Sequence, residues 1–288
     1  MTFPLIKNAT QGTKLLTFAL LLIFGLAFSI VLDTIITTTN GSNLYDLKNL
    51  QISQIISGIV SFLVPAVAYV MFVQEKPCNY LGIKKLQTWS LLGIVAMFTV
   101  IPFLSWVTEW NDGIVFPESM QALEEQLRNI QAQSEEIIMV LIGQGSLFSS
   151  LIIIAALAAI SEELLFRSVI QKAFIKLFKN AHVGIIVTAI VFSAIHGDLF
   201  GFVPRCILGL MLGYMFWMSG SIFPSMLMHF ANNVTIVMLY YLDTRGYADI
   251  DVERFGSTDN ILVIIMSLIT TVAIFITCNR FKLKNDNR

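Results

Sequence analysis

Apolar residues along the chain fall into long runs separated by short polar, glycine or proline segments, a pattern typical of helices that cross a membrane. Several runs approach or exceed the ~20 residues that a helix needs to span a bilayer. We expect eight spans, at approximately residues 14–38, 51–73, 90–107, 146–172, 182–199, 202–219, 221–241 and 259–279. The third is short and is interrupted by Pro102. The pattern therefore predicts an all-α polytopic membrane protein.

One long polar segment, residues 108–145, has a pattern of its own. Between Pro117 and Glu136 the apolar residues recur at spacings of three and four, as on one face of a helix, at Met120, Leu123, Leu127 and Ile130. Glutamates occupy the other faces, which does not favour contact with anionic lipid. We therefore expect an amphipathic helix that packs against the protein on the outer side of the membrane.

The composition supports a membrane location and excludes other classes. Of 288 residues, 56% are hydrophobic and 13% are charged, whereas ordinary soluble domains are about 25% charged. One water-soluble core could not hide so much apolar surface. The 18 basic and 19 acidic residues form no dense basic patch, so we expect membrane lipids as partners and no nucleic acid. Cys78, Cys206 and Cys278 are far apart in the sequence and are interpreted as isolated thiols.

Lysine and arginine residues are unevenly divided between the two sides of the predicted membrane. On one side, together with both termini, lie Lys7, Lys14, Lys76, Lys84, Lys85, Lys172, Lys176, Lys179, Arg280, Lys282, Lys284 and Arg288. On the other side lie Lys48, Arg128, Arg205, Arg245 and Arg254. Because basic residues gather in cytoplasmic loops, both termini should be cytoplasmic, and an even number of spans agrees with this.

The fourth span carries three ionisable residues within an apolar helix, namely Glu162, Glu163 and Arg167. A charge in hydrocarbon costs at least ~2.5–3.5 kcal/mol, so this cluster needs an explanation. Glu163 and Arg167 are four residues apart, which places them on one face of the helix where they can pair. Glu162 is turned about 100° away and is free to point into a cavity. We therefore expect one structural carboxylate and one that is available for chemistry.

Two histidines lie inside other spans, His196 in the fifth and His229 in the seventh, and Asn233 follows His229 one turn later. At ~1.5 Å per residue, Glu162 and His229 lie about 15 Å and about 12 Å from the cytoplasmic ends of their helices. His196 lies about 21 Å from the same end of its own helix. These depths allow the four side chains to meet in a central intramembrane cavity.

Such a group could hydrolyse a peptide bond. Glu162 with His196 could take a proton from water and make the nucleophile. His229 and the Asn233 amide could donate hydrogen bonds to the oxyanion of the tetrahedral intermediate. Alternatively, Glu162, His196 and His229 could hold Zn²⁺ with one open coordination position. The residues alone leave both versions open, so no cofactor is certain.

Taken together, these residues resemble the three motifs of a known family. Glu162-Glu163-x-x-x-Arg167, Phe192-x-x-x-His196 and His229-x-x-x-Asn233 match in order and type the motifs of the CPBP (Abi) family. That family contains the type II CAAX prenyl endopeptidases and the lysostaphin-resistance protein A-like proteins. The motifs lie within residues 140–240, and the eight-span layout is similar along the whole chain.

The resemblance implies an intramembrane endopeptidase with an all-helical fold that acts on a membrane-associated peptide or protein. It implies Glu162 as the water-activating carboxylate, with His196 as its partner. It further implies that His229 and Asn233 stabilise the oxyanion, and that Glu163 and Arg167 support the site. Members of the family are commonly labelled metalloproteases, and a metal-free glutamate mechanism has also been argued for them.

We expect a single membrane domain over residues 1–288. Within it we expect three N-terminal spans in 1–110, the amphipathic helix at 111–136, a catalytic core at 140–241 and a last span at 259–279. With the resemblance, this organisation predicts an integral protein of a bacterial inner (plasma) membrane.

Other functions fit these residues less well. The chain has no HExxH, no GxSG serine segment and no GxGD, so other kinds of intramembrane protease are disfavoured. A proton-coupled carrier also uses buried Glu and His, but the related halves typical of carriers are missing. The alternative that stays open is a non-proteolytic binding or immunity module of the same family. Nothing in the sequence points to a particular substrate.

Overall fold

The computed structural model describes residues 4–41, 46–252 and 254–286; Arg288, counted above among the basic residues, lies outside them. Every regular element in these residues is helical, which confirms the all-α prediction. Here η denotes a π-helical or 3₁₀ segment. In chain order the elements are α1 (Gln11–Thr39), α2 (Leu47–Ile56), η1 (Ser57–Leu63), α3 (Val64–Val73), α4 (Pro77–Leu81), η2 (Thr88–Leu91), α5 (Leu92–Thr99), α6 (Ile101–Asp112), η3 (Glu118–Met120), α7 (Gln121–Gly143), α8 (Leu147–Ser150), η4 (Leu151–Leu157), α9 (Ala158–Leu165), η5 (Phe166–Gln171), α10 (Lys172–Phe178), α11 (Ala181–Ile195), α12 (Phe202–Ser219), α13 (Ile222–Thr244) and α14 (Ile261–Asp286).

Within the described part of the chain, six helical runs are long and apolar enough to cross a membrane. They are Gln11–Thr39, Leu47–Val73, Leu147–Phe178, Phe202–Ser219, Ile222–Thr244 and Ile261–Lys284. The pair Thr88–Thr99 and Ile101–Asp112 would make a seventh span with a bend of 47°. Helix α11 is apolar but has only 15 residues. The polytopic prediction is confirmed, and the count of eight spans stays a prediction.

Pro102 causes the bend between α5 and α6, and Ser267 of α14 satisfies the backbone groups that the bend leaves without partners. Pro102 stands in the first turn of α6 and has no N–H to continue the α5 hydrogen-bond ladder. Ser267 of α14 inserts its hydroxyl into the gap, donating to the carbonyl of Thr99 (2.6 Å) and accepting from the N–H of Phe103 (3.2 Å). Because a membrane offers no water to such backbone groups, this bridge makes the bend compatible with lipid surroundings.

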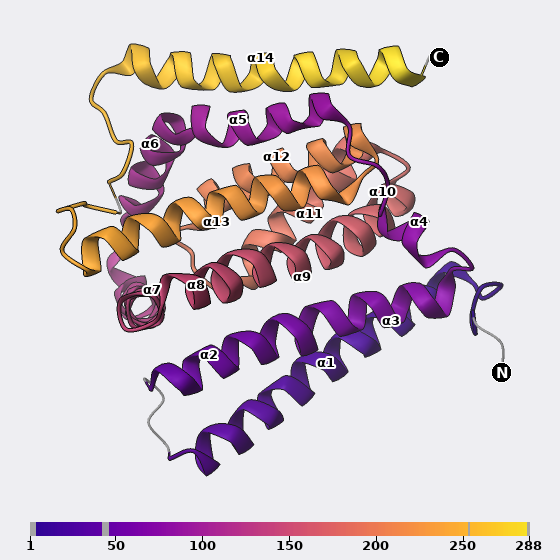
Figure 1. The fold of residues 1–288 in the computed structure, drawn as a ribbon, viewed down its shortest axis with the longest axis horizontal. Helices are drawn as coiled ribbons and strands as arrows, with labels where there is room; N and C mark the ends of the chain where they lie inside the picture. The colour runs from indigo at the N-terminus through magenta and orange to yellow at the C-terminus, as the bar shows by residue number, and fades with distance from the viewer. Residues whose placement is uncertain (1–3, 42–45, 253, 287–288) are drawn as a thin grey trace.

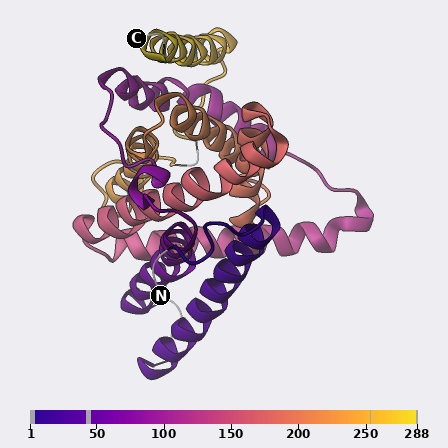
Figure 2. The same cartoon turned by 90° about the vertical axis from the view of Figure 1, so that its right-hand side faces the viewer.

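The long helices run side by side in three groups (Figure 1). Helix α1 with the α2–α3 run forms one edge, α8 to α13 form the middle, and α5 with α14 forms the opposite edge. Figure 2 shows the same order from the adjacent side. Helix α1 begins and α14 ends at the same end of the bundle, as an even number of crossings requires. The assignment of that end to the cytoplasm stays a prediction.

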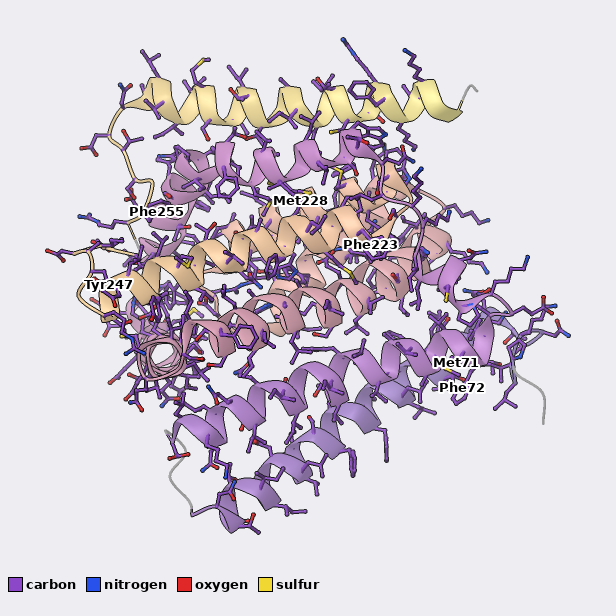
Figure 3. The ribbon with its side chains drawn as sticks, in the orientation of Figure 1. Met71, Phe72, Phe223, Met228, Tyr247 and Phe255 are labelled. Atoms are coloured by element: carbon purple, nitrogen blue, oxygen red, sulfur yellow. The ribbon has the colours of Figure 1, made fainter. Side chains whose placement is uncertain are left out.

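Small residues let neighbouring helices in the middle group approach closely. A Cβ on Gly209 of α12 would lie 3.2 Å from the Cα of Ala189 on α11, and one on Gly213 would lie 2.8 Å from Oε1 of Gln171. On the other side of the group, Met228 of α13 is fully buried and points toward α5 (Figure 3), where Gly93 makes room for its sulfur. The middle helices are therefore held in a fixed mutual arrangement.

A helix does form in the long polar segment, but its limits differ from the expected Pro117–Glu136. The segment opens with a 3₁₀ turn, and α7 then continues to Gly143 because Leu141 and Ile142 extend the apolar face and are buried. The first half of α7 extends sideways beyond the other helices (Figure 2). There Arg128 pairs with Asp112 at 2.8 Å, and this carboxylate raises the pKa of Arg128. The side of the membrane on which α7 lies stays a prediction.

Candidate functional site

Glu163 is the centre of a buried polar cluster. Its carboxylate is fully buried, and its Oε2 lies 3.0 Å from Nε of Arg167 one turn later on the same helical run. Ser225, which comes from α13, donates a hydrogen bond to the same oxygen. The pairing expected from the spacing is therefore present. Because an unpaired buried charge is strongly destabilising, these contacts are what allow Glu163 to be ionised inside the bundle.

Arg167 is fully buried as well, and its guanidinium is only partly satisfied. Its Cζ lies 5.1 Å from the ring centroid of Phe192, so the cation is placed over an aromatic face. Neither Nη1 nor Nη2 has a hydrogen-bond partner among the described residues. Arg167 therefore balances the charge of Glu163 and joins α9–η5 to α11 through Phe192.

His229 of α13 lies between the two consecutive glutamates. Its Nδ1 is 3.1 Å from Oε1 of Glu163, and its Nε2 is 3.9 Å from Oε2 of Glu162. The side chain is 9% exposed, so these contacts are largely screened from solvent. Glu163, as an ionised acceptor, places a proton on Nδ1 of His229. The structural carboxylate thus orients the imidazole, and the second carboxylate faces the other nitrogen.

Glu162 differs from Glu163 in how well its carboxylate is satisfied. Its side chain is 14% exposed, and its Oε2 is buried with no hydrogen-bond partner among the described residues. A buried acceptor without a partner is costly, which distinguishes Glu162 from its fully satisfied neighbour Glu163. Glu162 also lies within electrostatic range of both His196 and His229.

His196 caps the C-terminal end of α11 and is held by its own helix. Its Nδ1 lies 2.8 Å from the carbonyl oxygen of Phe192, which fixes the proton on Nδ1 and leaves Nε2 as an acceptor in the neutral ring. The Phe192 ring packs edge-on against both imidazoles, with centroids 5.1 Å from His196 and 6.0 Å from His229. Phe192 therefore sets the spacing of the two histidines.

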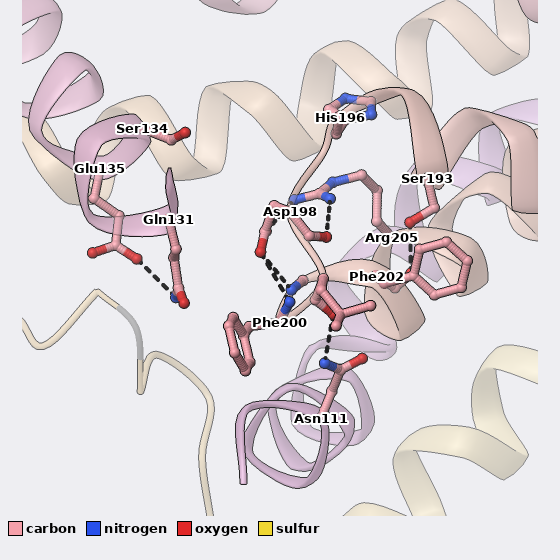
Figure 4. Close-up of polar contacts among 12 residues, drawn as sticks. Asn111, Gln131, Ser134, Glu135, Ser193, His196, Asp198, Phe200, Phe202 and Arg205 are labelled. Atoms are coloured by element: carbon pink, nitrogen blue, oxygen red, sulfur yellow. Dashed lines mark hydrogen bonds and ion pairs between the residues drawn. The ribbon is translucent and has the colours of Figure 1, made fainter. Parts of the chain in front are cut away.

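The loop that follows His196 is tied down by several polar contacts (Figure 4). Asp198 accepts hydrogen bonds from the N–H groups of Phe200 and Gly201 and pairs with Arg205 at 2.8 Å. The buried Asn111 of α6 donates to the carbonyl of Leu199 (2.9 Å) and accepts from the N–H of Val203. Asp198 and Arg205 therefore stabilise the turn that presents His196.

A cavity of about 400 Å³ opens beside these side chains. Its lining includes Phe192, His196, Arg205, His229 and Asn233. Glu162 is not part of the lining and reaches the site through its 3.9 Å approach to His229. Asn233 donates to the carbonyl of Ile154 at 3.3 Å and accepts from Asn232 at 3.2 Å. The second N–H of the Asn233 amide stays available for a group in the cavity.

The helical run that carries the glutamates is not a regular α-helix. Helix α9 lies between two π-helical segments, η4 before it and η5 after it. Such segments are rare and often lie at functional sites. Ile154, the residue whose carbonyl accepts from Asn233, belongs to η4. The irregular backbone thus takes part in positioning the Asn233 amide.

The arrangement of the donor side chains does not match a metal site. In the described ranges no group of three or more His, Cys, Asp or Glu side chains lies close enough to hold a metal ion. Nδ1 of His229 is engaged by Glu163, which leaves Nε2 as the nitrogen that faces Glu162. As they stand, Glu162, His196 and His229 do not fit a shared metal ion, and we derive no step through one. Metal dependence stays a prediction from the sequence.

Two contributors to the site were not singled out from the sequence. Ser225 lies one turn before His229 on α13, and Asn232 is the direct neighbour of Asn233. A serine four residues ahead of a span histidine was the available signal, because that spacing places both on one helix face. Serine is common in packed membrane helices, so that signal alone does not separate support of a carboxylate from helix packing.

Comparison with known families agrees with this geometry. Residues 144–235 match the family described as Type II CAAX prenyl endopeptidase Rce1-like. The matched segment contains every site residue singled out above from the motifs, from Glu162 to Asn233. No curated protein and no solved structure matched the chain. Residues 144–235 are thus similar to the type II CAAX prenyl endopeptidases, which supports the family resemblance expected from the three motifs.

Proposed function

We propose that the protein is an intramembrane endopeptidase that hydrolyses a peptide bond of a membrane-associated substrate. One observation carries the proposal. Oε2 of Glu162 is buried and has no hydrogen-bond partner among the described residues, and it lies 3.9 Å from Nε2 of His229, a residue that lines the cavity. Such an oxygen is suited to bind and deprotonate a water molecule.

In the first step Glu162 takes a proton from water, and the resulting hydroxide forms a bond to the carbonyl carbon of the substrate. His196 supports this step through the Nε2 lone pair, which accepts the second hydrogen of the water and so orients it. The tetrahedral intermediate then breaks its C–N bond. Glu162 returns its proton to the leaving amine, so the carboxylate is regenerated after each turnover.

His229 and Asn233 are placed to stabilise the negative oxygen of the intermediate. Asn233 lines the cavity, and its amide has a second N–H besides the one that donates to Ile154. Because Nδ1 of His229 already carries a proton toward Glu163, donation from Nε2 requires the doubly protonated ring. The carboxylates of Glu162 and Glu163 flank that ring and balance its positive charge. Removal of one such donor typically costs 10²–10³ in kcat.

The test uses the full-length protein in lipid nanodiscs and three probe peptides. One probe carries a farnesylated CAAX end, one is the same peptide without the lipid, and one is a single apolar span. Cleavage is followed by mass spectrometry in ¹⁸O water, so that hydrolysis marks the new carboxyl group. Glu162→Gln should lower cleavage about 10²-fold or more. Glu136→Gln, on the exposed surface of α7, serves as the matched control and should cleave normally.

The outcomes separate the two candidate functions. Full cleavage by Glu162→Gln contradicts the proposed mechanism. The alternative function is a non-proteolytic binding or immunity module. It is favoured if wild type binds a probe without cutting it and Glu162→Gln binds that probe equally well.

A further inference from the structure

An apolar groove lies away from the glutamate–histidine cluster, between α12 and α14. It has a volume of about 520 Å³. Its walls come mainly from Ile207 and Met211 of α12, Leu268 and Phe275 of α14, and Val100 and Phe103 at the α5–α6 bend. Helix α14 is the outermost helix on this edge of the bundle (Figure 1), so the groove lies where lipid surrounds the protein.

One end of the groove is polar and aromatic. Nδ1 of His182 is within 2.9 Å of the hydroxyl of Tyr214, and the His182 ring packs beside Trp217. Nζ of Lys282 lies 3.5 Å from the ring centroid of Trp217. Tyrosine, tryptophan and basic side chains of this kind gather where a membrane helix meets the headgroup layer. This end of the groove therefore lies at the level of lipid headgroups.

The charged side chains at that end of the groove are basic. Arg280 lines the groove and Lys282 lies beside it, and no acidic side chain lines the groove in the described part of the chain. Neither Arg280 nor Lys282 forms an ion pair with a described side chain. Two cations above an apolar trough are complementary to an anionic headgroup with its acyl chain.

The length of the groove agrees with this occupant. Leu268 and Arg280 mark its two ends on α14, and twelve residues of helix rise about 18 Å at ~1.5 Å per residue. One leaflet is half of a ~30 Å hydrocarbon core, or about 15 Å. The groove is thus about as long as the hydrocarbon layer of one leaflet is thick.

We propose that the α12–α14 groove binds an anionic phospholipid of the leaflet next to the two termini, with one acyl chain against α14 and the phosphate at Arg280 and Lys282. The site is independent of the hydrolysis proposed above. The lipid fills the apolar gap between α14 and α12, and its phosphate places a negative charge beside Arg280 and Lys282.

The experiment measures lipid binding to the purified full-length protein by native mass spectrometry from neutral detergent. Phosphatidylglycerol should bind in preference to phosphatidylcholine of the same chains, and inorganic phosphate alone should not compete. In Arg280→Gln/Lys282→Gln the apparent affinity for phosphatidylglycerol should fall roughly tenfold to thirtyfold. Leu268→Trp should fill the trough and reduce binding of the first lipid molecule.

The matched control is Lys84→Gln/Lys85→Gln, which removes two exposed cations from the loop between α4 and η2 at the same end of the bundle. It should bind phosphatidylglycerol as wild type does. Equal binding of the two lipids overturns the proposal, as does undiminished phosphatidylglycerol binding by Arg280→Gln/Lys282→Gln. Thermal unfolding without added lipid verifies that each variant is folded, and Lys282→Arg should retain binding.

Discussion

Nδ1 of His229 lies 3.1 Å from Oε1 of Glu163, although 66 residues separate them in the sequence. The contact joins α13 to α9 inside the bundle, and the same carboxylate binds Arg167 and Ser225 through its second oxygen. Glu163 thus uses both oxygens to fix groups on two helices. Its neighbour Glu162 leaves Oε2 unbonded among the described residues. Of the two consecutive glutamates, Glu163 therefore holds the site together, and Glu162 is the one that we propose for the reaction.

This difference predicts that substitution of the two glutamates has unequal effects on stability. Glu163→Gln leaves Arg167 as an uncompensated buried charge and should lower the free energy of unfolding by about 3–5 kcal/mol. Glu162→Gln alters only the carboxylate with the unbonded oxygen and should change that free energy by less than about 1 kcal/mol. Denaturant unfolding in mixed micelles compares the two variants. Equal losses in both would contradict the division of roles.

The sequence was sufficient for features that depend on local spacing. The pairing of Glu163 with Arg167 follows from one helical turn, and the break near Pro102 follows from a missing N–H. The contact of His229 with Glu163 could not be derived in the same way, because it depends on how α13 is rotated against α9. That rotation is set by packing over many residues, including Met228 against Gly93.

The residues at which the helices end also could not be derived from the spacing of apolar residues. The end of α7 lies at Gly143 rather than near Glu136 because Leu141 and Ile142 are buried by tertiary packing. Helix α11 ends at Ile195 so that His196 caps it, and the contacts of Asp198 and Asn111 then shape the loop. Each of these limits depends on partners that are distant in sequence or outside the helix itself.

Helix α1 has no room for a side chain at Gly25. A Cβ at this position would lie 2.7 Å from the carbonyl oxygen of Val60 and 2.7 Å from the Pro65 ring, neither of which can move freely. Gly25→Ala should therefore destabilise the protein by about 1–3 kcal/mol, despite the better helix propensity of alanine. Gly12→Ala is the control, because its Cβ would meet nothing closer than 3.9 Å. Thermal unfolding of the two variants checks this, and equal melting temperatures would refute the close approach.

The bend between α5 and α6 should depend on the hydroxyl of Ser267 in α14. Ser267→Ala removes the hydroxyl that bridges Thr99 and Phe103, and water is not available to replace it. We expect a loss of about 1–2 kcal/mol and faster hydrogen exchange of the Phe103 amide. Thr277→Ala on the same helix removes an exposed hydroxyl bonded only within α14 and is the control. Unchanged exchange at Phe103 in Ser267→Ala would show that the bridge is not formed.

Removal of metal ions should not affect the proposed reaction. In the proposed mechanism Glu162 activates water directly, and Nδ1 of His229 is bound by Glu163 while its Nε2 donates to the oxyanion. Prolonged dialysis against a strong zinc chelator should therefore leave cleavage of the probe peptides unchanged within about twofold, because no step needs a Lewis acid. A zinc metalloprotease treated in parallel verifies that chelation was complete. If cleavage is lost and returns on addition of Zn²⁺ alone, the chelated protein must have lost a metal that Glu162, His196 and His229 come together to bind. His229 would then act as a ligand oriented by Glu163 rather than as an oxyanion donor.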